Sequence, residues 1–258
     1  VAFNVQKSPT DQVLVRKALA SAVDRGQVLA ALGTPWRPAA TGVLLPGMLG
    51  YQTVGYAYNP DQARAYLTAA GYPGGVGFPE LVLYANDNNQ MVYEAVAAQW
   101  RSVLNIPVRT LYLHNRAYFR HLRECSNDPA NCGQNAFRTT WYLDYAEPDN
   151  ILYGLLDPTS PWAATSKLFP TGWNSPAYHT LVMDSRGELN EGLRIADLQA
   201  AERIVVEEDA VVMPLFFHET LYLVKPGILP VMDTYGLMAS RWGNVDSDED
   251  GQHDLLDP

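Results

Sequence analysis

The stretch that decides how this chain is interpreted lies at residues 141–150. It reads Trp141-Tyr142-Leu143-Asp144-Tyr145-Ala146-Glu147-Pro148-Asp149-Asn150. A strand-like run at residues 136–140 precedes it, so aromatic rings and carboxylates follow the point where a strand is expected to end. Ligands of α/β proteins usually bind beyond such strand ends, and an aromatic wall with one or two charges is typical of a small-molecule or peptide pocket. A core strand followed by an acidic turn explains the same spacing.

The bulk composition is that of a globular protein. The chain has 258 residues, of which 47% are hydrophobic, enough to form the core of one large domain or slightly more. No apolar run approaches the roughly 20 residues that a membrane-spanning helix needs. The net charge of −10 argues against a nucleic-acid partner, because phosphate contacts need a basic surface.

Before the opening stretch, helix and strand patterns alternate. Residues 80–85 and 106–113 read as strands, and residues 91–104 between them read as a helix. A strand, a helix and a strand over this length predict a βαβ unit with parallel strands. Further helices are expected at residues 13–32 with a break near Asp24, from Asn59 to Gly71, and at residues 115–123, 176–184 and 191–208; a strand is expected at residues 210–217. The pattern predicts an α/β fold with a mixed sheet and flanking helices.

Two cysteines, Cys125 and Cys132, lie seven residues apart, and the Asn, Asp and Pro between them favour a tight reversal of the chain. A disulfide that closes this loop would stabilise the fold by roughly 2.5 kcal/mol on the chain-entropy model and would imply an oxidising compartment. The alternative is a metal site, because His121 lies four residues before Cys125. That site would lack a fourth ligand, so the disulfide is the favoured interpretation.

Several segments, in this order, resemble motifs of solute-binding family 5, the oligopeptide-, dipeptide- and nickel-binding components of bacterial ABC importers. The segments are Phe3-Asn4 with residues 15–25 (VRKALASAVDR), residues 58–73 (YNPDQARAYLTAAGYP), residues 141–150, residues 174–178 (NSPAY) and residues 210–217 (AVVMPLFF). Each motif alone is weakly specific, whereas their common order is a strong signal. His179 departs from the pattern, because the family usually has Asp there.

The resemblance implies a periplasmic-binding-protein-like fold of type II. Family members have two lobes that enclose the ligand. Residues 1–210 are similar to the second lobe, and residues 211–242 are similar to the segment that returns to the first lobe. We therefore expect the first lobe to belong to a longer protein of which this chain is the second half.

The function implied by the resemblance is binding rather than catalysis. The protein is expected to be the extracellular or periplasmic substrate-binding component of an ABC importer, anchored to the membrane as a lipoprotein in its full-length form. Its partners would be an oligopeptide or dipeptide, the membrane permease and the missing first lobe.

Four ligand-binding residues are expected, and two of them match positions of the family's motif. Asp144 matches the position that pairs with the α-amino group of a peptide, and Trp141 matches a residue that lines a side-chain pocket. Arg138 lies where some members place an arginine that meets a ligand carboxylate, and Tyr142 is expected to join them. Leu143 stands where many members have Ala, so the size of the pocket is not fixed by the motif.

The acidic tail, residues 243–258, is the second informative stretch. Its side-chain oxygens and one backbone carbonyl have the spacing of an EF-hand-type calcium loop, with Gly251 at the sharp turn. The predicted ligands are Asp246, Asp248, Asp250, Gln252, Asp254 and Asp257. Because Pro258 follows at once, the loop resembles the isolated Asp-rich loops of dockerins and thrombospondin type 3 repeats. A solvated acidic tail is the alternative.

Other functions remain open at the level of sequence. An enzyme is disfavoured, since the chain has no Gly-x-Ser-x-Gly or His-Glu-x-x-His motif. A non-peptide solute such as a nickel chelate, haem or an oligosaccharide is a minor alternative, because the five histidines show no i, i+4 pairing with one another. A calcium-stabilised surface module is a further alternative.

Overall fold

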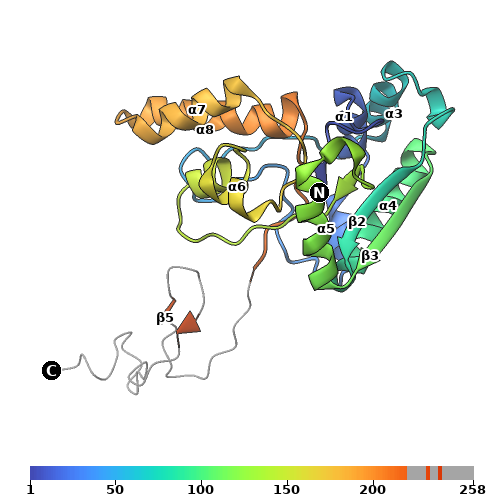
Figure 1. Ribbon diagram of the computed structural model, residues 1–258, viewed down its shortest axis with the longest axis horizontal. Helices are drawn as coiled ribbons and strands as arrows, with labels where there is room; N and C mark the ends of the chain where they lie inside the picture. The colour runs from blue at the N-terminus through green and yellow to red at the C-terminus, as the bar shows by residue number, and fades with distance from the viewer. Residues whose placement is uncertain (220–230, 233–237, 240–258) are drawn as a thin grey trace. The chain divides into compact units, whose positions relative to one another are not determined.

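The computed structural model describes residues 1–219, 231–232 and 238–239 (Figure 1). The chain divides into two units. The first comprises residues 1–141 and 147–217, and the second comprises residues 142–146 and the chain from residue 218 onward. Within the second unit, strands β5 (Val231–Met232) and β6 (Met238–Ala239) pair in antiparallel fashion.

A four-stranded mixed sheet lies at the centre of the first unit. Its strands are β1 (Ala2–Phe3), β4 (Ala136–Phe137), β2 (Leu81–Asn86) and β3 (Val108–Leu113), in that spatial order. Strand β2 runs parallel to both β3 and β4, whereas β1 is antiparallel to β4. The helix α4 (Gln90–Leu104) connects β2 to β3, so the predicted parallel βαβ unit is confirmed.

The other helical segments follow the expected order. They are α1 (Val13–Ser21), α2 (Arg25–Ala31), α3 (Pro60–Ala69), η1 (Pro73–Gly75), η2 (Asp87–Asn89), α5 (Asn115–Asn127), η3 (Pro129–Asn131), η4 (Asn150–Leu155), α6 (Pro161–Ser166), α7 (Pro176–Gly187), α8 (Glu191–Arg203) and η5 (Ile204–Glu208). Side-chain caps explain two of the starts. Asp24 accepts a hydrogen bond from Gln27 N, which separates α2 from α1, and Asn59 accepts one from Gln62 N ahead of Pro60.

The two faces of the sheet have different cover. Because side chains alternate along a strand, Leu81, Leu83 and Ala85 of β2 face the main hydrophobic core together with residues of α1, α3 and α4. Tyr84 points to the other face, where its ring stacks on His121 of α5 at 4.5 Å. Helices therefore cover both faces of β2, with α4 on one face and α5 on the other (Figure 1).

The C-terminal end of α1 is capped by the helices around it. The indole N–H of Trp100, from α4, donates to the carbonyl of Leu19 at 2.9 Å, and Asn59 N donates to the carbonyl of Ser21 at 2.9 Å. These carbonyls belong to the last turn of α1, where helices lack internal partners. Tertiary contacts thus satisfy the end of this helix.

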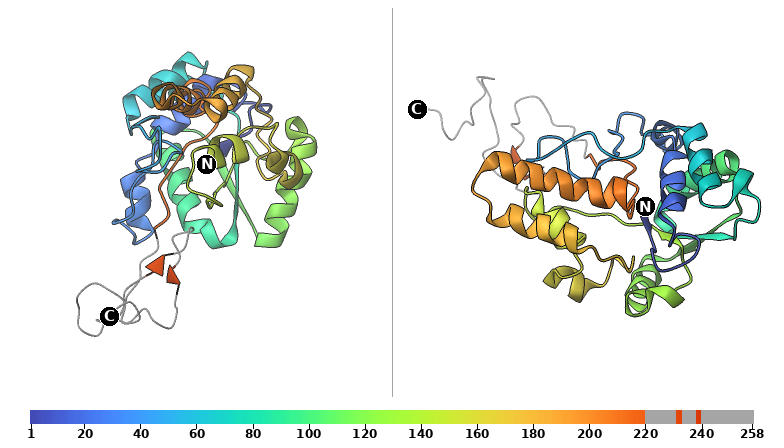
Figure 2. Two further views of the ribbon diagram at one scale, coloured as in Figure 1. Left: turned by 90° about the vertical axis from the view of Figure 1, so that its left-hand side faces the viewer. Right: turned by 90° about the horizontal axis from the view of Figure 1, so that it is seen from above.

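A second group of helices, α7 and α8 with η4 and α6, lies beside the sheet layer (Figures 1 and 2). Tyr178 of α7 is almost fully buried, and its hydroxyl donates to the carbonyl of Leu152 at 2.6 Å. Its ring packs edge-on against Trp173 at 4.8 Å. These contacts fix the segment that follows the opening stretch against α7.

The chain segment after η5 pairs with the first residues of the chain. Phe3 N donates to Val211 O at 2.9 Å, Met213 N donates to Val1 O at 2.8 Å, and Ala2 bridges Val212. The expected strand at residues 210–217 was nevertheless wrong, since only isolated bridges form there. Ala210 adopts a left-handed conformation with φ of 46°, and Pro214 has no N–H to contribute to a ladder.

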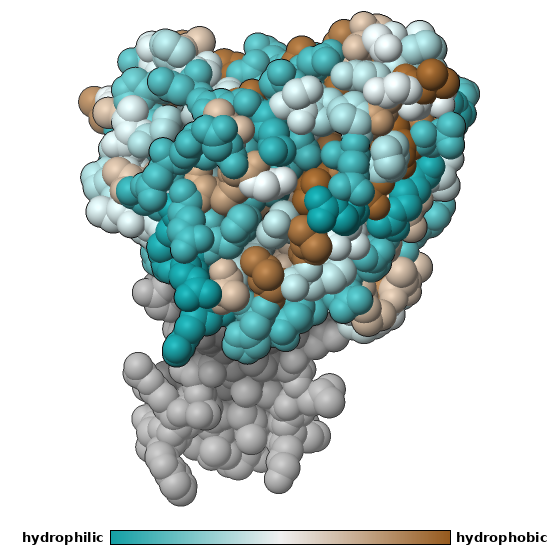
Figure 3. All heavy atoms as spheres, turned by 45° about the vertical axis from the view of Figure 1, so that its right-hand side comes forward, coloured by the Kyte–Doolittle hydropathy of each residue, from teal (hydrophilic) through white to brown (hydrophobic). Residues whose placement is uncertain are grey.

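The strand expected at residues 136–140 is shorter than predicted, because β4 ends at Phe137. No helix in the described part of the chain is long and apolar enough to cross a membrane. The face drawn in Figure 3 is mainly hydrophilic, with hydrophobic residues in small separate groups.

Candidate functional site

Trp141 is fixed by two polar and aromatic contacts within the first unit. Its indole N–H donates to the side-chain oxygen of Asn150 at 2.5 Å. Its ring packs edge-to-face on Trp162 of α6, with the centroids 4.3 Å apart. Since Asn150 is buried at the start of η4, the indole is held rigidly by its neighbours. A rigid aromatic surface of this kind is suited to packing against a ligand side chain.

Arg138 follows the last residue of β4 and extends its pairing. Its backbone N–H donates to Tyr84 O at 2.9 Å, and its carbonyl accepts from the hydroxyl of Tyr118 at 2.5 Å. Burial raises the pKa of Tyr118 well above its ordinary value, so this hydroxyl is a permanent donor. Among the described residues, the guanidinium of Arg138 has no ion-pair partner.

Two of the three acids in the opening stretch are engaged by arginines. Glu147 pairs with Arg194 of α8 at 2.9 Å, and Asp149 lies 3.5 Å from Arg186 of α7. The Arg186 guanidinium also lies 4.0 Å from the centre of the Tyr153 ring. These contacts tie the segment after Ala146 to the helical pair, and they give Glu147 and Asp149 a structural role.

Asp144 and Tyr142 belong to the second unit, and both are exposed. The Tyr142 ring is 71% exposed and lies roughly parallel to the imidazole of His218 at 5.8 Å, within the same unit. In the part of the chain that the structure describes, Asp144 has no ion pair. The four predicted ligand residues are thus divided, with Arg138 and Trp141 in the first unit and Asp144 and Tyr142 in the second.

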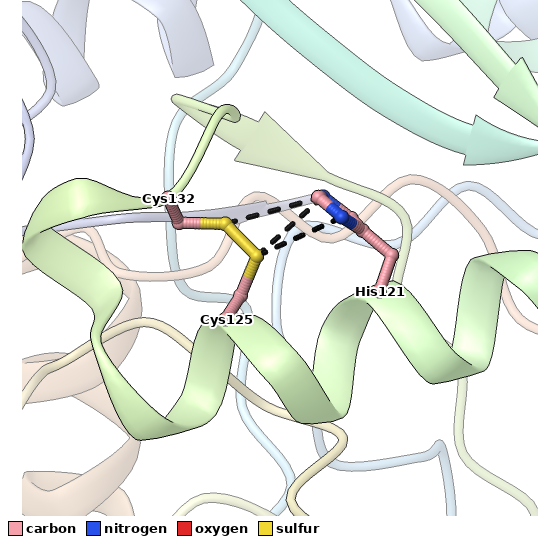
Figure 4. Close-up of side chains that lie close together, drawn as sticks. All are labelled: His121, Cys125 and Cys132. Atoms are coloured by element: carbon pink, nitrogen blue, oxygen red, sulfur yellow. Dashed lines mark hydrogen bonds between the residues drawn. A yellow bond between two sulfur atoms is a disulfide. The ribbon is translucent and has the colours of Figure 1, made fainter.

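The predicted disulfide between Cys125 and Cys132 is present, and it joins the last turns of α5 to the loop before β4 (Figure 4). His121 points at the bridge, with Nε2 at 3.5 Å from Cys125 Sγ and 3.9 Å from Cys132 Sγ. The side chain of Gln134 completes the group, because its Oε1 lies 2.9 Å from Cys132 Sγ. The predicted calcium ligands, Asp246 to Asp257, lie outside the described residues.

Three residues without a predicted role contact the predicted side chains: Asn150 and Trp162 hold Trp141, and Gln134 lies against the disulfide. Asn150 was part of the opening stretch, but nothing in its spacing predicted a bond to Trp141. Trp162 was an aromatic residue in a loop-rich region, and Gln134 was a polar residue without a motif. Contacts of this kind depend on tertiary packing, for which a single sequence carries no signal.

The fold of the first unit is that of periplasmic binding proteins. A solved structure of a periplasmic oligopeptide-binding protein (OppAIV) from Borrelia burgdorferi superimposes with a TM-score of 0.70 at 25% identity, over 83% of this chain and 41% of that chain. The predicted fold class is therefore confirmed. The chain belongs to the bacterial extracellular solute-binding proteins, family 5, whose middle-region model matches residues 1–162.

Curated relatives extend this picture. The chain is 30% identical over 234 residues to the periplasmic murein peptide-binding protein MppA of Escherichia coli, over 87% of this chain and 41% of the relative. It is 25% identical over 221 residues to heme-binding protein A of Haemophilus influenzae, over 83% of this chain and 38% of the relative. The chain thus spans about two fifths of the length of these relatives. Both are binding proteins by name.

Proposed function

We propose that this chain is part of the substrate-binding component of an ABC importer, and that the protein binds oligopeptides or dipeptides without catalysing a reaction. Membership of solute-binding family 5 supports the importer role. The names of two relatives, a murein peptide-binding protein and an oligopeptide-binding protein, support a peptide ligand.

The proposal of a peptide ligand depends most on the exposed carboxylate of Asp144. The two neighbouring acids, Glu147 and Asp149, are paired with arginines, whereas Asp144 is exposed and has no ion pair among the described residues. It follows the anchored Trp141 by three positions. A carboxylate that loses water when a cleft closes pairs strongly with an ammonium group. We therefore assign Asp144 to the α-amino group of the peptide and Trp141 to a neighbouring side chain.

The test is Asp144→Asn in the full-length protein, with calorimetry on peptides that have a free or an acetylated amino terminus. We expect the substitution to weaken binding of the free-amine peptide about 10- to 100-fold, since a charge-assisted hydrogen bond contributes about 1.5–3 kcal/mol. Acetylation should weaken wild-type binding to a similar extent and should have little further effect on the variant.

Glu147→Gln is the matched control, because it removes one negative charge from the same stretch but from an acid that already pairs with Arg194. Its affinity for the free-amine peptide should stay within about twofold of wild type. An Asp144→Asn variant with wild-type affinity for both peptides would remove the α-amino role.

A non-peptide solute is the second candidate, and the relative named heme-binding protein A supports keeping it. A nickel chelate, haem or an oligosaccharide lacks the α-amino group that Asp144 is proposed to meet. Screening the full-length protein against peptide, sugar and metal-chelate pools separates the candidates. Binding of a non-peptide pool alone would replace the peptide assignment while leaving the importer role in place.

We also infer how the rest of the protein is organised. Residues 1–210 would form the second ligand-binding lobe, and residues 211–242 would form the return segment to a first lobe elsewhere in the protein. A lipid anchor would hold the full-length protein at the outer face of the membrane. Mass spectrometry of the natural protein from membrane fractions tests this. A soluble product without a lipid and without a preceding lobe would contradict it.

The acidic tail is proposed to bind calcium through Asp246, Asp248, Asp250, Gln252, Asp254 and Asp257. The support is the agreement of its sequence with the ligand spacing of calcium loops. Calcium would then give the tail a defined conformation. A surface module stabilised by calcium is a further alternative function for the protein.

A further inference from the structure

The bridge between Cys125 and Cys132 lies inside a larger group of possible metal ligands. His121 Nε2 and the two sulfurs all lie within 4.8 Å of one another (Figure 4). Gln134 brings its Oε1 to 2.5 Å from His121 Nε2, 3.3 Å from Cys125 Sγ and 2.9 Å from Cys132 Sγ. Four potential ligand atoms, two sulfurs, one nitrogen and one oxygen, therefore converge on one point beneath Tyr84, whose ring stacks on His121.

The side chain of Gln134 is only partly hydrogen-bonded beside the disulfide. Its side chain is fully buried, and its Nε2 has no hydrogen-bond partner among the described residues. The sulfurs of a disulfide carry no hydrogen, so only the ring of His121 can donate to Oε1. A buried polar group without partners is costly. Opening the bridge leaves Nε2 without a partner, but two thiols would donate to Oε1 and a cation would bind it, so the oxygen gains partners in the reduced state.

The separations between His121 Nε2 and the two sulfurs agree with those around a tetrahedral metal ion, whereas Gln134 Oε1 lies closer to its neighbours and would have to move outward to bind the same ion. With Zn–S bonds of about 2.3 Å and Zn–N bonds of about 2.0–2.1 Å, sulfur and nitrogen ligands lie about 3.5 Å apart. His121 Nε2 lies 3.5 and 3.9 Å from the two sulfurs. Two thiolates on one zinc ion lie about 3.8 Å apart. The Cα atoms of Cys125 and Cys132, 5.2 Å apart, allow that separation by rotation of the side chains.

We propose that reduction of the Cys125–Cys132 disulfide creates a site for one zinc-like divalent ion, with both thiolates, His121 and the Gln134 oxygen as ligands. A dithiol reductant transfers two electrons and two protons to the disulfide, so that two thiols form and the reductant becomes a disulfide. The incoming dication then displaces the two thiol protons. The fourth ligand that the sequence did not offer is the amide oxygen of Gln134, two residues after Cys132.

The test uses the whole chain, reduced with a dithiol, freed of reductant under anaerobic conditions and titrated with Co²⁺ and then Zn²⁺. We expect one Co²⁺ per chain with a sulfur-to-cobalt charge-transfer band and the visible bands of a tetrahedral site, and displacement by Zn²⁺. The oxidised protein should show no such band. His121→Ala should weaken Co²⁺ binding at least about 10-fold, and Gln134→Leu should alter the visible bands.

The variant with Cys125→Ser and Cys132→Ser together is the matched control, since it keeps His121, Gln134 and every acid of the tail. Metal that binds to it belongs elsewhere on the chain. If this variant does not fold by circular dichroism, the oxidised wild-type protein takes its place. A reduced wild-type protein without a charge-transfer band would overturn the proposal. Peptide binding is not involved in any step, so failure here leaves the importer function untouched.

Discussion

Glu202 of α8 is a fully buried carboxylate that holds the long segment between α2 and α3. Its Oε1 accepts the backbone N–H groups of Val43 and Leu44 at 2.7 and 2.9 Å, and Gln52 approaches Oε2 at 3.3 Å. Burial raises its pKa, and the hydrogen bonds lower the pKa by less, so the pKa lies above the ordinary value. The folded protein therefore retains a proton on Glu202 at pH values where the unfolded chain has lost it.

This residue predicts a distinct pH dependence of stability. Between the unfolded pKa, about 4.3, and the raised folded pKa, the folded state binds more protons than the unfolded state. The free energy of unfolding should therefore fall as pH rises through this window. Glu202→Gln keeps an acceptor oxygen but cannot titrate, so its stability relative to wild type should improve from pH 4 to pH 7. Urea unfolding at a series of pH values measures the difference.

Glu202→Ala provides the comparison at the same position. It leaves the buried N–H of Leu44 and the half-buried N–H of Val43 without an acceptor, which should cost about 2–4 kcal/mol. A Glu202→Gln variant that changes with pH in parallel with wild type would show that Glu202 does not carry this dependence.

At the scale of single residues, sequence reasoning was unevenly successful. Leu198, Ala201 and Val205 share one face of the helix expected at residues 191–208, and all three are buried. Glu202 lies beside them and is equally buried, although glutamate is rarely fully buried in proteins. Its partners are backbone N–H groups about 160 positions away, and a sequence pattern does not register such contacts.

At the scale of secondary-structure elements, Trp100 of α4 stabilises the C-terminal end of α1. It is fully buried in α4, and it caps the last turn of α1 through the carbonyl of Leu19. Trp100→Phe should remove this hydrogen bond, leave the carbonyl unpaired and open a small cavity. The expected cost is about 2–4 kcal/mol, measured as a lower urea midpoint with an unchanged m value.

Trp36→Phe is the control for this prediction, since the Trp36 side chain is 54% exposed. Its effect should stay within about 0.5 kcal/mol, as for most surface substitutions. Equal effects of the two substitutions would show that the cap on α1 contributes little.

The boundaries of the elements were predictable where local chemistry sets them. The helix start at Asn59 and Pro60 and the break near Asp24 were both predicted, and the structure shows a side-chain cap at each. The strands were less predictable. Residues 136–140 and 210–217 were expected to form strands, but β4 ends at Phe137 and the later segment forms only bridges. Strand length depends on the partner strands, which local patterns do not specify.

At the scale of the whole molecule, the order of weak motifs along the chain identified the fold class correctly, and the family match over residues 1–162 confirmed it. The predicted ligand site stays a prediction. Its four expected residues are divided between two structural units, and a pattern along the chain does not specify how such units meet.

The tail adds a prediction that concerns the chain as a whole. One calcium ion should bind with a dissociation constant of order 10⁻⁴ to 10⁻³ M, the range of extracellular calcium modules. Asp246→Asn together with Asp250→Asn should abolish the heat of binding in a calorimetric titration, whereas Asp184→Asn, an acid of α7, should not. Absence of any calcium heat at millimolar concentrations in the wild-type chain would contradict the proposed loop.

The hydrogen bonds between residues 1–3 and residues 211–213 bring the first residues of the first unit beside some of its last. Almost the entire unit therefore lies between two chain segments that are paired with each other. The folded unit already holds these segments together, so a host protein would incur no further loop-closure entropy cost for joining them. We expect that a unit with adjacent ends can be inserted into a surface turn of a host protein through linkers of only a few residues, with little distortion of either fold. The same adjacency predicts that a related unit could replace this one while both connections to the host stay in place.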